Sequence, residues 1–163
     1  MPIPVYMLCS ESLSVDSITG LLSHYRVFNS LQITPLGTKG PTVLPPSATP
    51  WFQMTASATW MLEAGERVYD KYEYQFVIRQ PKDGPELIVG SGFFTFAKLF
   101  HRIDLNVQGQ PLSQSGTFHI ENRIRKTGAS TWIKQSYPLV VEVVGQIQSD
   151  ATDDKPPSAE SKS

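Results

Sequence analysis

Apolar and polar residues alternate most regularly between Asp70 and Phe96. In the first half of this stretch, one parity is polar and the other carries Tyr72, Tyr74, Phe76 and Ile78. Successive side chains of a strand point to opposite faces, so this pattern predicts a half-buried strand. Asp83-Gly84, flanked by prolines, is a turn signal because glycine accepts a positive φ. The sequence therefore predicts a long β-hairpin, with Gly90 and Gly92 in its second arm indicating a bulge or a close approach of backbone.

The same alternation predicts strands on both sides of this hairpin, over residues 5–10, 51–62, 99–107, 117–126 and 131–144. In the segment 51–62 the apolar parity carries Phe52, Met54, Ala56, Ala58, Trp60 and Leu62. In the segment 99–107 it carries Leu99, His101, Ile103, Leu105 and Val107. The last two segments form a second predicted hairpin, whose inner faces start with Phe118 in one arm and Ile133 in the other.

The segment 14–25 fits two structures. Asp16 is a suitable N-cap for a helix with an apolar stripe of Ile18, Leu21, Leu22 and Tyr25. Gly20 weakens such a helix, and Thr19-Gly20 is equally suited to turn the chain into a second strand that runs to Ile33. We favour the turn and strand.

Two segments are predicted to lack regular structure. Five prolines between Pro35 and Pro50 remove backbone donors, which indicates a long loop. Residues 147–163 are polar and have no apolar periodicity, so we expect a disordered tail after a single domain over residues 1–146. About eight strands with little secure helix predict an all-β fold, an antiparallel β-sandwich.

The order of these features resembles an uncharacterised family of bacterial immunoglobulin-like β-sandwich domains. The resemblance rests on a first strand that ends in Cys9, the Thr19-Gly20 turn, a loop that ends in prolines, the tyrosine-rich hairpin, and the run Gly116–Glu121 before Trp132. It spans most of residues 1–146 and implies a sandwich without an assigned activity. It transfers no catalytic residue.

Charge and composition narrow the range of partners and compartments. The net charge is −1, and no cluster of Lys and Arg stands out, which argues against nucleic acid as a partner. No apolar run is long enough to span a bilayer, and the N-terminus lacks the basic start of a secretion signal, so we expect no membrane partner. A single cysteine, Cys9, cannot form an internal disulfide and favours a reducing compartment. These observations predict a cytoplasmic protein.

Motifs that carry chemistry are missing. His24, His101 and His119 share no short ligand spacing with each other or with Cys9, so no metal site is expected. The chain has neither a glycine-rich loop between strand and helix nor a Gly-x-Ser-x-Gly elbow. Cys9 is expected to be a buried, inert thiol. The sequence therefore predicts no catalytic residue and no cofactor.

Surface aromatics and one charged pair remain as candidate site residues. Trp60, Tyr72 and Tyr74 fall on apolar parities and are expected in the core, whereas Trp51 and Trp132 fall on polar parities. Arg102 and Asp104 lie on the parity opposite to His101, so we expect these two side chains to be outside and paired, with the imidazole inside and its pKa lowered by burial. Trp51, Arg102, Asp104 and Trp132 are the predicted interaction surface.

A non-enzymatic accessory or protein-interaction module is the function that we expect, because the open edges of a sandwich are ready sites for recognition and for assembly into a homo-oligomer. The alternative is a carbohydrate-binding or other ligand-binding module, with Trp51 and Trp132 as a sugar-stacking platform.

Overall fold

The computed structural model describes residues 1–17, 22–33, 53–82, 84–109, 112 and 114–144. This part of the chain contains nine strands and no helix. Their bounds are β1 (Ile3–Val15), β2 (Leu22–Val27), β3 (Ser30–Ile33), β4 (Gln53–Met61), β5 (Lys71–Arg79), β6 (Glu86–Thr95), β7 (Phe100–Gln108), β8 (Gly116–Lys126) and β9 (Ile133–Val143). The predicted loop from Pro35 to Pro50 and the predicted tail over residues 147–163 lie outside the described residues.

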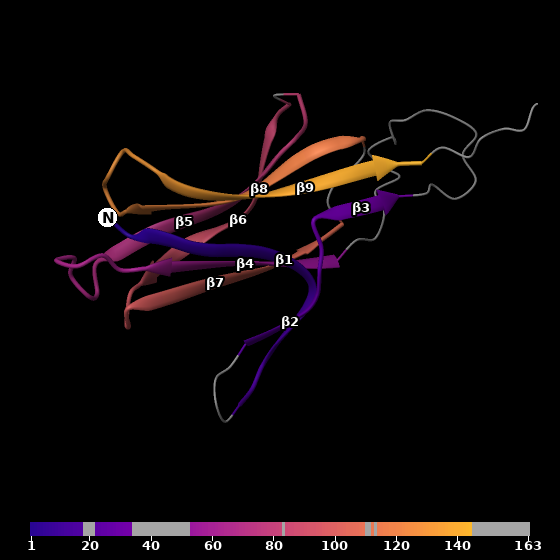
Figure 1. Ribbon diagram of the computed structural model, residues 1–163. Coiled ribbons are helices and arrows are strands. Elements are labelled where there is room, and N and C mark those ends of the chain that lie inside the picture. The colour runs from indigo at the N-terminus through magenta and orange to yellow at the C-terminus, as the bar shows by residue number, and fades with distance from the viewer. Residues whose placement is uncertain (18–21, 34–52, 83, 110–111, 113, 145–163) are drawn as a thin grey trace, which may run out of the picture.

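The strands form two sheets that pack face to face (Figure 1). One sheet has the order β2-β1-β4-β7 and the other the order β3-β9-β8-β5-β6. All neighbouring strands are antiparallel except β3 and β9, which run parallel. Figure 1 also shows the β1–β2 ribbon projecting from the body of the sandwich on the side of the four-stranded sheet. The predicted antiparallel β-sandwich is confirmed.

The core lies between the sheets and is filled by the apolar parities that the sequence indicates. Its largest fully buried side chains include Trp60 of β4, Phe76 of β5 and Phe118 of β8. Tyr72 is also buried, and the ring of Tyr74 packs against the same cluster. Burying such side chains contributes about 1.5–3 kcal/mol each relative to leaving them exposed, so this layer is the main source of stability. The prediction that Trp60, Tyr72 and Tyr74 are core residues is confirmed.

A buried hydrogen bond joins the two sheets across this core. The indole Nε1 of Trp60 in β4 donates to Oδ1 of Asn122 in β8 at 2.7 Å. Asn122 is fully buried, and its Nδ2 donates at 3.3 Å to the backbone carbonyl of Gln75 in β5. A single amide therefore satisfies a donor from one sheet and an acceptor from the other, which matters because an unpaired buried polar group is costly.

Strand β4 is buried on both faces. Its polar parity, Thr55, Ser57 and Thr59, is at most 7 % exposed. These residues lie between the larger side chains of β1 and β7, since Leu8 and Asp104 flank Ser57 in the strand register. Hydroxyl side chains in the second strand from the edge are thus covered by neighbours in their own sheet.

The predicted hairpin is formed by β5 and β6, and the two interpretations of Gly90 and Gly92, a bulge and a close approach, are confirmed. Among the described residues of the turn, the one with a positive φ is Lys82, at 57°. A register shift between Phe76 and Val77 marks a bulge, with Gly90 on one side of it. A Cβ added to Gly90 would lie 2.8 Å from Leu105 Cδ1 of β7, and one added to Gly92 would lie 2.7 Å from the Tyr74 ring. Glycine is needed at these two positions of β6 because side chains from β5 and β7 occupy the space on the core-facing side of the strand, where a Cβ would lie.

The first third of the chain differs in part from the prediction. The turn-and-strand alternative for residues 14–25 is confirmed by the pairing of β2 with β1. The strand does not continue to Ile33, however. β2 ends at Val27, and after Phe28 and Asn29 the chain enters the other sheet as β3. Phe28 N still donates to Cys9 O in one sheet at 3.1 Å, whereas Asn29 O accepts from Val140 N in the other at 2.8 Å. β1 also extends well beyond the predicted residues 5–10.

Candidate interaction surface

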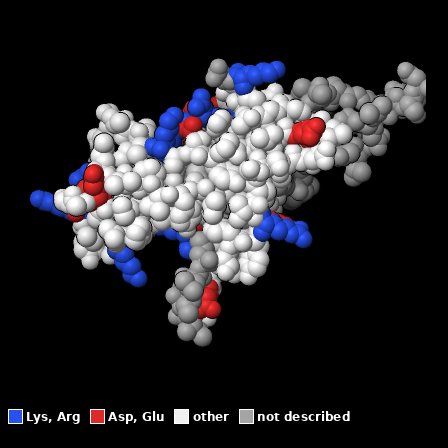
Figure 2. Space-filling model, viewed as in Figure 1, with Lys and Arg blue, Asp and Glu red and all other residues white. Residues whose placement is uncertain are grey.

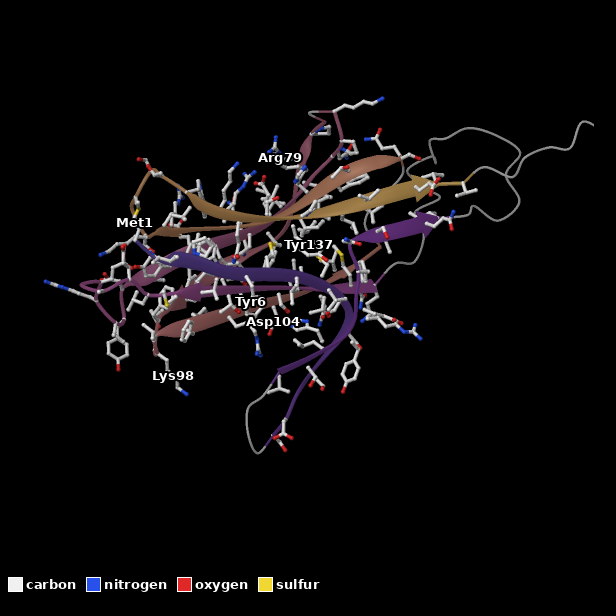
Figure 3. All side chains as sticks on the ribbon, in the orientation of Figure 1. Met1, Tyr6, Arg79, Lys98, Asp104 and Tyr137 are labelled. Atoms are coloured by element: carbon white, nitrogen blue, oxygen red, sulfur yellow. The ribbon has the colours of Figure 1, made fainter. Side chains whose placement is uncertain are left out.

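The predicted surface residues that the structure describes lie on different faces of the sandwich. Trp51 is outside the described residues. Arg102 and Asp104 lie on the outer face of the four-stranded sheet, where Arg102 Nε donates to Asp104 Oδ2 at 2.8 Å. Trp132 follows β8 and packs under Arg125, on the outer side of the five-stranded sheet. Figure 3 shows Asp104 and Arg79, which mark these two outer faces, on opposite sides of the molecule. The structure thus brings Arg102 and Asp104 together but separates them from Trp132.

His101 occupies the position expected from its parity. Its ring is half-buried between the sheets and stacks on Phe94 of β6, with ring centroids 4.2 Å apart and an interplanar angle of 8°. Burial lowers the pKa of this imidazole below its usual value. The predicted inward position of His101 and the predicted outward pair Arg102–Asp104 are both confirmed.

Ser10 of β1 and His24 of β2 form a polar cluster on the four-stranded sheet, near Asp104 and Arg102 of β7. His24 Nδ1 is 3.1 Å from Ser10 Oγ, and burial lowers the pKa of this histidine, while Asp104 raises it and Arg102 lowers it further. The set of Ser, His and Asp side chains resembles a catalytic triad only in composition. Ser10 is fully buried, so it is closed to a substrate. Asp104 bonds to Arg102, and within the described residues His24 Nε2 has no hydrogen-bond partner, so the carboxylate does not orient the imidazole as it would in a triad.

The outer face of the five-stranded sheet carries a network of ion pairs at its centre. Glu121 of β8 is only 2 % exposed, and its carboxylate lies 2.6 Å from Arg123 Nη2 and 3.2 Å from Arg79 Nη1. Lys134 of β9 approaches it at 3.9 Å. Figure 2 shows acidic and basic side chains side by side over this sheet. The network crosses β9, β8, β5 and β6, because Arg123 also pairs with Glu86 at 2.7 Å.

The pairing of Glu86 with Arg123 favours the charged form of both groups. Hydrogen bonds from Arg123 are the largest cause of the lowered pKa of Glu86. The same bonds are the largest cause of the raised pKa of Arg123. A lowered carboxyl pKa means that the pairing stabilises the fold above the ordinary carboxyl pKa and that this contribution is lost as the pH falls through the lowered value. Glu86 and Arg123 are therefore both charged at neutral pH.

A second row of side chains crosses the same face closer to the β8–β9 turn. Register places Arg125, Glu73 and Phe93 side by side on β8, β5 and β6. Arg125 Nη2 lies 2.6 Å from Glu73 Oε2 and its guanidinium covers the Trp132 ring, with Cζ 4.4 Å from the centroid. Lys71 Nζ lies 4.4 Å from the centroid of Phe93. Each aromatic ring of this row is thus held by a cation.

The row ends at β6, which is an edge strand in the described part of the sheet. Ile88 and Phe93 of β6 are 56 % and 60 % exposed. We use the term β6 face for the outer side of β6 and its neighbours, defined by Glu86, Ile88, Phe93, Lys71 and Arg79. Unpaired backbone along an edge and exposed apolar side chains beside it are the usual marks of a docking surface.

Cys9 is fully buried in β1, as the sequence predicts, and burial raises the pKa of its thiol to about 12. We expect the native protein to resist a thiol reagent at pH 8, because the reactive thiolate is scarce and the sulfur is covered. Addition of a denaturant should expose the thiol and allow complete labelling. Absorbance of the released chromophore from a disulfide reagent measures both rates, and equal rates in the native and unfolded protein would contradict the prediction.

The sequence analysis did not identify the β6 face as a candidate interaction surface. Parity places Glu121 on the outer side of β8, but its burial depends on Arg79 and Lys134 from neighbouring strands whose order the sequence does not give.

Among the described residues, no three His, Cys, Asp or Glu side chains gather as metal ligands would. No helix of the described part is long and apolar enough to cross a membrane. No family model matches the chain, and no curated protein matches it either.

Proposed function

We propose that this protein is a non-enzymatic, cytoplasmic protein-interaction module of the immunoglobulin-like type, and that it binds a protein through the β6 face. One observation carries the proposal. An edge strand exposes Ile88 and Phe93 next to arginine and glutamate side chains that are already held in place by ion pairs. Aromatic residues and arginines that are fixed before binding are typical of the central contacts of protein interfaces.

The strand order supports the immunoglobulin-like assignment. The last two strands, β9 and β8, lie beside the consecutive strands β5 and β6, and the remaining sheet is built on β1, β4 and β7. This arrangement corresponds to the G-F-C-C′ sheet of a variable-type domain packed on the A-B-E strands. The hydrogen bond from Trp60 to Asn122 joins β4 and β8, the strands that correspond to B and F, which a disulfide links in antibody domains.

Self-association is the simplest form of such an interaction, since closed homo-oligomers are common and an edge strand can pair with its own copy. We expect Phe93→Glu and Ile88→Lys each to reduce the molar mass of the protein to that of the monomer, because a charge on the β6 face would oppose pairing. Light scattering over a wide range of concentrations measures this mass.

The matched control is Val15→Lys, which adds a charge at an exposed apolar position of the β1–β2 ribbon, 48 % exposed. This variant should keep the mass of the wild type. A wild-type protein that is monomeric throughout the concentration range, or variants that assemble as the wild type does, would contradict self-association through the β6 face.

A ligand-binding module is the second candidate function. Its sugar-stacking form loses part of its support, because the Trp132 ring already has the Arg125 guanidinium on one side. The observation in favour of a ligand is a pocket of about 490 Å³ at the end of the sandwich that holds the N-terminus.

A further inference from the structure

Another pocket, of about 410 Å³, lies between the β5–β6 turn and the start of β8, at the other end of β8 from the pocket near the N-terminus. Figure 3 labels Arg79 at the base of this turn. Gly116 lets the two walls meet, because its φ is +141° and a Cβ on it would lie 2.7 Å from the Pro81 ring. The volume is within the range of small-molecule sites.

The charged side chains that line this pocket, among the described residues, are cations. They are Arg79 and Lys82, and no described carboxylate belongs to the lining. Lys82 is exposed, and the described ion pairs of this region involve Arg79 and not Lys82. Two cations that share a pocket without a carboxylate favour an anion between them.

The carboxylates that contact Arg79 are held more closely by an arginine outside the pocket. Glu86 and Glu121 lie 3.5 and 3.2 Å from Arg79, but 2.7 and 2.6 Å from Arg123. An excess of one positive charge remains when the whole corner is counted with the residue that follows Lys82 in the sequence. The cations are Arg79, Lys82, Arg123 and Lys134, and the carboxylates are Asp83, Glu86 and Glu121.

Uncharged side chains of the lining add hydrogen-bond donors. Ser115 Oγ accepts a bond from the backbone amide of Val143 at 3.0 Å, which leaves its hydroxyl hydrogen for another acceptor. His119 Nδ1 lies 3.2 Å from Ser136 Oγ, so Nε2 is the ring nitrogen left for a ligand. Thr117 is exposed and brings a second hydroxyl to the pocket.

This set of donors suits a phosphate group better than a carboxylate. A phosphate ester carries about −1.5 to −2 charges at pH 7 and three strong acceptor oxygens, so it can bind two cations and several neutral donors together. The guanidinium of Arg79 contacts its two carboxylates through Nε and Nη1, and its Nη2 is the nitrogen left for an oxyanion.

We propose that this pocket binds a phosphate group, as inorganic phosphate or as a small phosphate monoester, with its oxygens held by Arg79, Lys82 and the hydroxyl and imidazole donors beside them. This inference rests on the second candidate function, at a different pocket, and is independent of assembly through the β6 face.

Titration of the full chain with inorganic phosphate and, separately, with O-phosphoserine tests the proposal by two-dimensional amide NMR. Ionic strength is held constant with sodium chloride, so that the screening of surface charges does not change during the titration. We expect saturable shifts at the amides of Lys82, Gly116 and Thr117, which line the pocket. Serine and acetate, which lack the phosphate group, should bind at least about tenfold more weakly.

The two phosphate ligands identify the source of the group. Binding of phosphoserine at least as tight as that of inorganic phosphate indicates a monoester, and tighter binding of inorganic phosphate indicates the free ion. Both comparisons use only the wild-type protein, so they do not depend on the folding of a variant.

A variant then tests the contribution of the unpaired cation. Lys82→Gln should weaken phosphate binding by about threefold to tenfold, because it removes a charge-assisted hydrogen bond at an exposed position. The matched control is Lys98→Gln, which removes the same charge from another exposed loop lysine and should bind as the wild type does. Figure 3 shows Lys98 and Arg79 on opposite sides of the molecule. The same spectra show whether each variant is folded.

Three results would overturn the proposal: no saturable shift at the pocket amides with either phosphate ligand, equal binding of serine or acetate, or unchanged binding by folded Lys82→Gln. None of them bears on assembly through the β6 face, which the light-scattering experiment tests separately.

Discussion

Replacing Asn122 with alanine should lower the free energy of unfolding by about 2–3 kcal/mol. The substitution removes the acceptor of the Trp60 indole and the donor to the Gln75 carbonyl, and it leaves both groups buried. It also opens a small cavity between the sheets. Urea unfolding followed by tryptophan fluorescence measures the loss, because Trp60 lies in the core and reports the separation of the sheets.

The matched control is Asn106→Ala on β7. Asn106 is exposed and its Oδ1 accepts a single side-chain bond, from Thr55 Oγ1 at 2.9 Å. Its loss should cost less than about 1 kcal/mol, because water can replace the partner. Equal effects of the two substitutions would show that the bond across the core contributes nothing beyond an ordinary surface amide.

Glu121→Gln should destabilise the fold by about 1–3 kcal/mol at neutral pH. The uncharged amide keeps the size of the side chain but leaves three cations, Arg79, Arg123 and Lys134, with one carboxylate fewer on the face of the sheet. The effect should be smaller than the full cost of an isolated buried charge, since Glu86 still pairs with both arginines. Thermal unfolding followed by circular dichroism measures the change.

Glu86→Gln provides the comparison, because Glu86 contacts the same arginines from a side chain that is 44 % exposed. A pair of that kind contributes about 0–1 kcal/mol, so we expect a smaller loss than for Glu121→Gln. The loss caused by Glu86→Gln should shrink as the pH falls through the lowered pKa of Glu86, since protonation of that carboxyl removes its pairing in the wild type as well. A larger effect at Glu86 would contradict the role assigned to the buried position.

Much of the sandwich could be predicted because the alternation of apolar and polar residues within one strand indicates which of its faces is buried. The alternation from Tyr72 to Ile78 gives the inner face of β5 without any knowledge of its neighbours, and the Asp83-Gly84 turn gives the direction of β6. The same reasoning places His101 inward and Arg102 outward. Even Asn122 has a signal in the sequence, since it shares the parity of Ile120 and Ile124.

Features that depend on strand order could not be predicted. The separation of Trp132 from Arg102 follows from their location on different sheets, which alternation does not specify. β3 has only four residues, and its partner β9 lies at the other end of the sequence of the domain. No local sequence pattern therefore indicates that the chain passes from one sheet to the other between β2 and β3. The pocket near Tyr72 is formed by two loops and the N-terminus, so it becomes visible only when these segments are placed in space.

The parallel pairing of β3 with β9 has a consequence for biosynthesis. Ser30 aligns with Val140, so this contact joins two residues that are 110 positions apart in the sequence. While the chain is on the ribosome, β3 has no partner strand in the described structure until the last strand leaves the exit tunnel. The four-stranded sheet, by contrast, can pair all its strands once β7 is synthesised. We therefore expect the halves of the sandwich to mature at different times, with the closing pair forming after translation of the domain is complete.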